Sequence, residues 1–315
     1  MPTPLSWLDS SSASRRKAME VIKLFEEKGT VDEIGIGSVR DALSDSLFPG
    51  TSVLHTRARY LFLVPWIYQY LEGKKIPSAA IAKEARRLEI ALIDTLLQNE
   101  DFAGTIGRVA RGRLRQLPST MYWSALAAWG IKPSDQSQDQ YHRSLDRFYR
   151  LRETGTRDDD GQPLDGPRLR NWHPSLPAAP TSFPRCPIAH ALTRAEADYL
   201  RERILTRCPG TLLAHLVDAC QPVDGLAFPW DHPDSAGFPP GASERLEHAR
   251  NFSEVIHGAA LLYNLMLAER GVAEGQSVHA EWAEGHKENY TGWVALMAER
   301  RAAHRWWNRA GSWKL

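Results

Sequence analysis

Residues 78–96, SAAIAKEARRLEIALIDTL, decide the fold class. Apolar side chains in this segment recur at intervals of three or four positions and form one stripe: Ile81, Ala85, Leu88, Leu92 and Leu96. Charged side chains fill other positions of the same turns: Lys83, Glu84, Arg87 and Asp94. This spacing predicts an amphipathic helix that begins at Ser78 and buries one face against the rest of the protein.

Helical periodicity continues on both sides of this segment, and no alternating run or hairpin signal typical of strands is found. Thr193 and Glu196 match a capping box, which predicts a helix start. The second half of the segment 243–270 is apolar almost all round, which predicts that this segment is the central helix of its domain. The further helices that we expect cover about 9–29, 38–48, 52–68, 120–129, 134–152, 193–204, 209–220 and 243–270. The sequence therefore predicts an all-α, multi-helical fold.

A long irregular segment separates the two helical halves of the chain. Residues 154–187 contain seven prolines and three glycines and have no sustained apolar period. A structureless loop of this length is unusual inside one compact domain. We therefore predict two helical lobes, 1–153 with the basic segment and 188–315 with a Trp-rich end, joined by a Pro- and Gly-rich linker over 154–187. Trp172 and Phe183 indicate that the linker packs along a neighbour.

Composition bounds the class of protein. The 315 residues carry 39 Lys and Arg against 38 Asp and Glu, a net charge of +1, so any basic surface for a polyanion must be local. The most apolar run, residues 60–71, contains Pro65 and is much shorter than the roughly 20 residues of a bilayer span. Three cysteines without a C-x-x-C pair are typical of reduced thiols. We expect a cytoplasmic protein with no membrane partner.

Motifs for catalysis and cofactor binding are incomplete. Residues 35–37, GIG, begin like a dinucleotide-binding loop, but Arg40 occupies the third glycine position and no strand precedes it. The histidines are not spaced as a metal set, and residues 158–160, DDD, are typical of a solvated acidic loop. The sequence predicts no catalytic residue, no metal and no cofactor, and favours a protein that is not an enzyme. A cryptic nuclease or other hydrolase with dispersed residues stays open as an alternative.

Residues 104–131 combine the densest positive charge with nearby aromatic side chains. From His55 to Arg152 the chain has 16 Lys and Arg against 9 Asp and Glu, and four of these arginines lie within eight residues. Guanidinium groups bind phosphate oxygens bidentately, and aromatic rings stack on unpaired bases. We predict that the following residues bind DNA or RNA: Arg57, Arg59, Arg108, Arg111, Arg113, Arg115, Tyr122 and Trp123. The alternative is a solvated basic helix with a buried Tyr-Trp pair.

The segments 120–129 and 134–152 also resemble a helix-turn-helix, in which a second helix enters the major groove of DNA. Four polar residues are then candidate groove contacts: Gln136, Gln138, Gln140 and Arg143. The connection between the two segments is longer than the usual tight turn, and Leu126 replaces the small residue often found there. This interpretation is therefore weaker than that of the arginine cluster.

Four tryptophans lie within the last 23 residues, close to several arginines: Trp293, Trp306, Trp307 and Trp313. Aromatic and arginine side chains are common anchors of protein interfaces. We therefore predict that this end of the chain contacts another protein, either a second copy or a partner enzyme. The alternative is that the rings are sealed against the protein's own core.

Four segments resemble an uncharacterised bacterial family with no assigned activity: LSWLDSS near the start, FPGTSVLHTRARYLFLVPWIY at 48–68, RLRQLPSTMYWSALAAWGI at 113–131 and LTRAEADYLRERI at 192–204. The LHTRARY and PSTMYW stretches are its most specific motifs. Members of the family are often encoded near helicases, nucleases or other phage-defence genes. The resemblance implies a context, anti-phage defence or DNA metabolism, and no mechanism. Together with the arginine cluster and the incomplete catalytic motifs, it leads us to expect a non-catalytic, nucleic-acid-associated accessory subunit of a bacterial anti-phage defence or DNA-metabolism complex, for which a helicase or nuclease is a candidate partner. A protein-only scaffold that docks a partner enzyme is the alternative.

Overall fold

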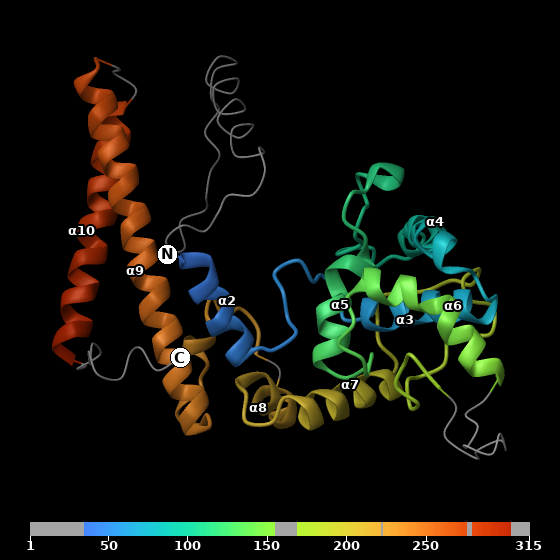
Figure 1. Cartoon of the computed structure of the whole chain (residues 1–315). Coiled ribbons are helices and arrows are strands. Elements are labelled where there is room, and N and C mark those ends of the chain that lie inside the picture. Colours follow the sequence, from blue (N-terminus) through green and yellow to red (C-terminus); the bar gives the residue numbers. More distant parts are fainter. Residues whose placement is uncertain (1–34, 155–168, 222, 276–278, 304–315) are drawn as a thin grey trace. The chain divides into compact units, whose positions relative to one another are not determined.

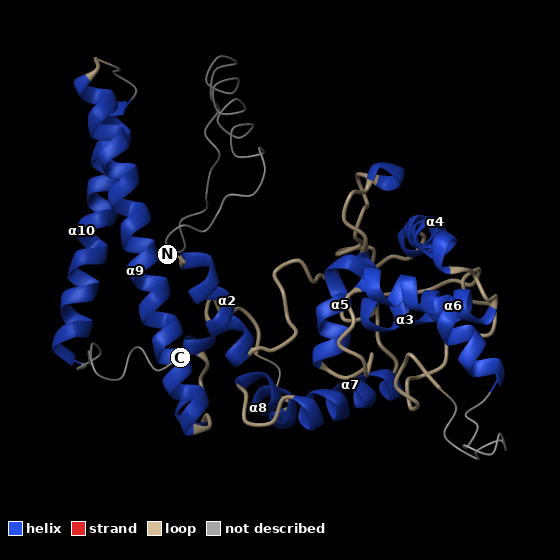
Figure 2. Cartoon of the chain, viewed as in Figure 1, coloured by secondary structure: helices blue, strands red, loops and turns tan. Residues whose placement is uncertain are grey.

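The computed structural model describes residues 35–154, 169–221, 223–275 and 279–303. These residues form nine α-helices and no strand, which confirms the all-α prediction (Figures 1 and 2). The helices are α2 (Ile36–Leu47), α3 (Tyr60–Gly73), α4 (Ser78–Leu97), α5 (Pro118–Ala128), α6 (Gln138–Thr154), α7 (Arg194–Arg207), α8 (Leu212–Ala219), α9 (Pro240–Ala273) and α10 (His279–Ala303). The chain divides into two compact units, Met1–Ala42 and Leu43–Leu315. The helix expected over 9–29 lies outside the described residues.

Helix α3 is the central element of the larger unit. Its side chains from Tyr60 to Tyr68 are all buried, and it packs against both α4 and α5. The helix begins at Tyr60 and not at residue 52, because the Tyr122 hydroxyl binds backbone N–H groups of the residues that precede the helix. The hydroxyl of Tyr122 accepts hydrogen bonds from the backbone N–H groups of Thr56 and Arg57 at 2.8 and 3.1 Å. The preceding segment therefore forms turns and not a further helical turn.

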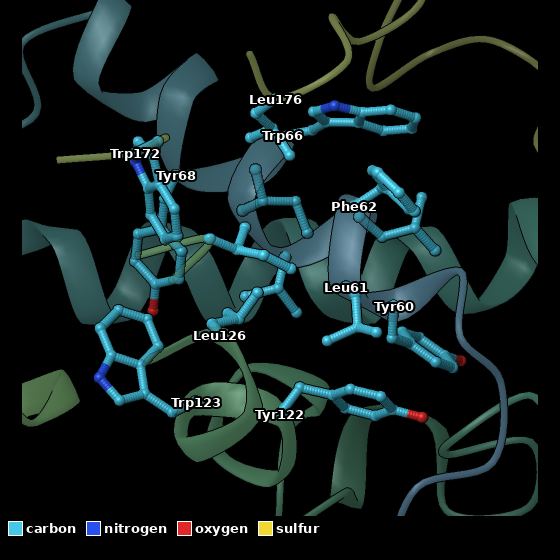
Figure 3. Packing of buried hydrophobic residues seen from close by; sticks show 14 of the residues in the cluster. Tyr60, Leu61, Phe62, Trp66, Tyr68, Tyr122, Trp123, Leu126, Trp172 and Leu176 are labelled. Carbon is cyan, nitrogen blue, oxygen red and sulfur yellow. The ribbon is translucent and has the colours of Figure 1, made fainter. Parts of the chain in front are cut away.

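The core around α3 is rich in aromatic rings (Figure 3). The ring of Tyr68 lies 5.5 Å from Trp123, 5.3 Å from Tyr141 and 6.1 Å from Trp172, measured between centroids. The contacts with Trp123 and Tyr141 are edge-to-face, a geometry that the charge distribution of aromatic rings favours. The high tryptophan content of the chain is thus partly explained by core packing.

The described part of the Pro-rich segment belongs to this same core. Trp172, Leu176 and Phe183 are buried in one cluster with residues of α3 to α7. The indole N–H of Trp66 also donates to the carbonyl of Pro177 at 2.8 Å. The segment expected as a linker therefore supplies core side chains, as the aromatic residues within it indicated.

Helix α7 begins with the predicted capping box. The Thr193 hydroxyl accepts from the Glu196 backbone N–H, and the Glu196 carboxylate accepts from the Thr193 backbone N–H at 2.7 Å.

The described residues of α8 and α9 contribute to a second, smaller cluster around Phe238 and Leu246.

Helices α9 and α10 form an antiparallel pair (Figure 1). The Trp293 indole donates to the Glu254 carbonyl at 2.9 Å and covers Gly258, whose lack of a side chain admits the ring. Helix α9 is not the central helix that its composition predicted, because α10 and one short 3₁₀ turn are its main neighbours among the described elements. Tyr263 and Met266 on α9 are about 60% exposed. None of the helices in the described ranges is long and apolar enough to cross a bilayer.

Candidate nucleic-acid interface

The predicted arginine cluster lies on the connection between α4 and α5. We call residues 102–117 the basic loop; it extends beside α4 and carries the 3₁₀ turn Arg111–Arg113 (Figure 1). The Arg86 guanidinium on α4 donates to the carbonyls of Gly112 and Leu114, each at 2.9 Å. One side chain of α4 thus fixes the backbone at the end of the loop.

Near the start of the basic loop, the backbone at Gly107 passes close to side chains of α4 and of the loop itself. Gly107 has a φ of +83°, and a Cβ there would lie 2.7 Å from Ile93 on α4 and 2.9 Å from Leu114. Only glycine meets both demands without strain. Arg111 also has a positive φ, of +48°, and its guanidinium pairs with Asp94 on α4. The loop is therefore held against α4 at both of these positions.

The basic loop presents its charge to solvent. Arg108, Arg111, Arg113 and Arg115 are all exposed, and residues 102–117 contain no Asp or Glu. Arg111 is the member that pairs with a carboxylate; among the described residues, no acidic side chain forms a salt bridge with the other three. The donors of these three arginines are therefore available to an anion, and all four arginines lie exposed on the basic loop.

An exposed aromatic ring lies at the start of the basic loop. Phe102 is 41% exposed, and the Arg108 guanidinium lies 5.7 Å from its ring centroid. An exposed aromatic ring next to arginine donors is the combination that proteins use to stack the bases of single-stranded nucleic acids. Val109 next to them is 85% exposed.

The other predicted arginines have structural roles. Arg59 is buried, forms an ion pair with Glu196 of α7, and lies over the Trp66 ring at 5.2 Å. Arg57 is half-buried; it donates to the Ala103 carbonyl at 2.8 Å and pairs with Asp101. Arg57 therefore fixes the backbone at the start of the basic loop. Arg59 links α7 to the core and is not available to a ligand.

Tyr122 and Trp123 lie inside the core, as the alternative to base stacking predicted. Tyr122 is 1% exposed, and its ring stacks on His55 at 4.1 Å. Trp123 is 7% exposed, and its indole donates to the Gln136 carbonyl at 3.0 Å. Neither ring can stack on a base while the protein is folded.

One of the groove contacts expected from the helix-turn-helix interpretation, Gln138, is not available to DNA. Gln138 at the start of α6 points into the protein, because its amide donates to the Tyr68 hydroxyl and the Ser119 hydroxyl, both at 2.8 Å.

Of the predicted partner-binding tryptophans, Trp293 is half-buried between α9 and α10. Trp306, Trp307 and Trp313 lie outside the described residues.

A buried polar network, which the sequence analysis did not predict, crosses the core. Glu89 on α4 is 1% exposed and accepts hydrogen bonds from the Ser119 backbone N–H and hydroxyl, both at 2.8 Å. Through Ser119 and Gln138 this network reaches Tyr68, whose hydroxyl lies 2.9 Å from His142 Nε2. Burial raises the pKa of the Glu89 carboxyl to about 7. The sequence contains a signal for this buried carboxylate, because Glu89 lies on the apolar stripe of α4, one turn after Ala85.

Glu72 is another buried carboxylate and lies near the end of α3. Its Oε1 accepts from the Asn171 amide at 3.1 Å, from the Trp172 indole at 2.9 Å and from the Tyr141 hydroxyl. Burial raises the pKa of this carboxyl. Glu72 also lines a cavity of about 330 Å³ together with residues of α6 and of the Pro-rich segment. No sequence pattern pointed to this site, because its walls come from three distant segments.

The described residues show no cluster of three or more His, Cys, Asp or Glu side chains that could hold a metal ion. The cysteines are free: Cys186 is half-buried, Cys208 buried and Cys220 exposed.

Comparison with known proteins gives one match. No curated protein and no solved structure matches the chain. The sequence model described as "Family of unknown function (DUF6361)" matches residues 3–295, which is most of the chain. The chain therefore belongs to this family of unknown function.

Proposed function

We propose that the protein binds nucleic acid through the basic loop, as a non-catalytic accessory subunit of a bacterial anti-phage defence or DNA-metabolism complex. The observation that carries the proposal is the exposure of four arginines on a loop that has no acidic residue. Neutralisation of phosphates by arginine releases counterions, which gives affinity without sequence preference. The Phe102 and Arg108 pair adds a stacking surface, which favours single-stranded or frayed nucleic acid.

The direct test replaces Arg108, Arg111, Arg113 and Arg115 by Glu and measures filter binding to single-stranded and duplex DNA and RNA at low salt. We expect binding to be lost and the helical circular dichroism spectrum to be kept, because these side chains are exposed. Absence of affinity in the unaltered protein at low salt would contradict the proposal. Incubation of the same samples with Mg²⁺ separates binding from cleavage; cleavage that depends on this protein would favour the nuclease alternative.

A matched control changes net charge by the same amount elsewhere. Arg40, Arg147, Arg194 and Arg270 are exposed and dispersed over α2, α6, α7 and α9. Their replacement by Glu should weaken binding only slightly, since long-range repulsion between exposed charges is screened by salt. Equal loss in both variants would mean that overall charge, and not the basic loop, determines affinity.

A scaffold function is the second candidate, and the apolar surface of α9 favours it. Tyr263, Met266 and Leu267 are large, apolar and about half exposed or more. Exposed apolar groups of this kind mark interaction sites when they are contiguous. If the protein is a scaffold, deletion of residues 305–315 should abolish association with a helicase or nuclease partner while the melting temperature is unchanged. A large fall in melting temperature would assign those residues to the protein's own core.

A further inference from the structure

One side of helix α9 is fixed against α10 by specific contacts. The Trp293 indole donates to the Glu254 carbonyl at 2.9 Å, and its ring covers Gly258. The Arg300 guanidinium donates to the Asn251 side chain at 2.9 Å. These contacts define the inner side of α9, along which α10 runs antiparallel.

A second apolar stripe runs along the opposite side of α9. Successive helical residues are rotated by about 100°, so Ile256 lies across the helix from Gly258, two positions later. Five residues of this stripe recur at intervals of four and three positions, as in the seam of a coiled coil: Phe252, Ile256, Ala259, Tyr263 and Met266. Val255, Leu262 and Leu267 flank this seam. We call these eight residues the outer stripe.

The later part of the outer stripe is open to solvent. Tyr263, Met266 and Leu267 are 62%, 59% and 48% exposed. Among the described elements, the main neighbours of α9 are α10 and the 3₁₀ turn Pro229–Asp231, and these exposures show that neither covers this part. A helix with two apolar sides is typical of a bundle in which it has more than one neighbour.

The outer stripe lies in a neutral part of α9. Residues 255–268 contain no Asp, Glu, Lys or Arg, so a charged partner would find no complementary group there. Exposed residues of α10, in contrast, include Glu284, Lys287 and Glu288. Charged residues are depleted from the cores of interfaces, and interfaces between identical subunits are the most apolar. The surface that fits the outer stripe is therefore itself neutral and apolar.

The sizes of the side chains make the outer stripe self-complementary. Ala259 and its neighbour Ala260 lie at the middle, with the large side chains of Ile256 before them and Tyr263 after them. This order of large, small and large residues is the same in both directions along the helix. When two copies of α9 meet antiparallel, the small residues face one another near the two-fold axis and let the helices approach closely.

The exposed area of the outer stripe is large enough for a specific contact between two copies. Its most exposed members are Val255, Leu262, Tyr263, Met266 and Leu267, all more than a third exposed. In a two-fold contact, these side chains from both copies together would remove roughly 1,000 Å² from water, which is the lower limit of a specific interface. The half-buried Phe252 and Ile256 add to this area.

We propose that the outer stripe is a homodimer interface. A second copy of this chain packs its own α9 antiparallel on the stripe, so that the two α9–α10 pairs form a four-helix bundle. The inference goes beyond the proposed function and does not depend on nucleic-acid binding. It assigns this surface of α9 to a second copy and not to a partner enzyme.

Sedimentation equilibrium of the full chain, from about 1 to 100 μM, measures the mass of the particle. We expect a concentration-dependent rise to twice the 35.4 kDa of the single chain. A mass of one chain at all of these concentrations would overturn the proposal.

Tyr263→Glu combined with Leu267→Lys places the assembly on α9. The two new charges are four positions apart with Glu first, which supports the helix and leaves the net charge unchanged. Dimer affinity should fall about 100-fold or more, since each substitution acts twice in a two-fold contact. The control, Val294→Glu with Ala298→Lys, makes the same change at exposed positions of α10 and should remain a dimer. An unchanged dimer of the α9 variant, or equal loss in both variants, would refute the assignment.

Two further variants keep the result decisive. Should the double α9 variant fail to fold, Met266→Gln, which adds no charge, should weaken the dimer about 10-fold, and an unchanged affinity would contradict the proposal. The variant with four glutamates in the basic loop should keep the dimer mass, whether or not the unaltered protein binds nucleic acid. Loss of the dimer in that variant would place the contact on the basic loop and overturn the role of α9.

Discussion

Replacement of Glu89 by Gln tests the buried polar network through the pH dependence of stability. Burial raises the pKa of Glu89 from 4.5 to about 7 in the folded protein. Below pH 4.5 this carboxyl is protonated in both states, so it has no differential effect. Between pH 4.5 and pH 7 the unfolded chain releases a proton that the folded chain keeps, so stability falls as pH rises. Above pH 7 the loss is complete.

The magnitude follows from the two pKa values. One pKa unit corresponds to about 1.4 kcal/mol, so Glu89 should lower the free energy of unfolding by about 3 kcal/mol across this range. Glutamine cannot titrate, and its amide can still accept from the Ser119 backbone N–H that Glu89 now binds. We therefore expect the stability of the unaltered protein relative to Glu89→Gln to fall by about 3 kcal/mol from pH 4.5 to pH 8.

Urea unfolding followed by circular dichroism at several pH values measures this difference. Glu100→Gln is the control, because Glu100 is exposed and takes no part in the network. Its pH profile should follow that of the unaltered protein. Parallel profiles for the unaltered protein and Glu89→Gln would refute the reasoning, since the buried carboxyl would then contribute no proton linkage.

Two further pairs of substitutions, each a test and its control, examine the packing. Arg59→Ala should cost about 3–5 kcal/mol of unfolding free energy, because it leaves a buried carboxylate unpaired, whereas Arg113→Ala on the exposed loop should cost less than about 0.5 kcal/mol; similar costs in urea unfolding would contradict these placements. Gly258→Ala should destabilise the α9–α10 pair by about 1–3 kcal/mol, since its Cβ would lie 2.1 Å from the Trp293 ring. The control is Gly292→Ala, whose Cβ meets nothing within 4 Å, so it should be neutral or stabilising; thermal unfolding of the two variants measures the difference.

Local patterns predicted most of the helices, although no helix was expected over 279–303, where α10 lies. The apolar stripe after Ser78 and the capping box at Thr193 concern residues within a turn or two of one another, so the sequence alone specifies them. The start of α3 was misplaced by several residues, because the hydroxyl of Tyr122, more than sixty residues away, binds the backbone before the helix. No local pattern carries that information.

The candidate site was predicted only in part for the same reason. The exposed arginines of the basic loop could be identified, since their charge density is a local property. The burial of Arg59 depends on Glu196, which lies 137 positions later, and the burial of Trp123 depends on rings from α3, α6 and the Pro-rich segment. Periodicity shows which side chains share a face, but not which element covers that face.

The measurement that tests the central claim most directly is the salt dependence of nucleic-acid binding. The logarithm of the association constant should fall linearly with the logarithm of salt concentration, with a slope that counts the phosphates neutralised. If the four arginines of the basic loop each neutralise one phosphate, their replacement by Ala should make the slope for duplex DNA shallower by about 3 to 4. A slope that is unchanged by this replacement would contradict the proposal that the basic loop binds the phosphate backbone.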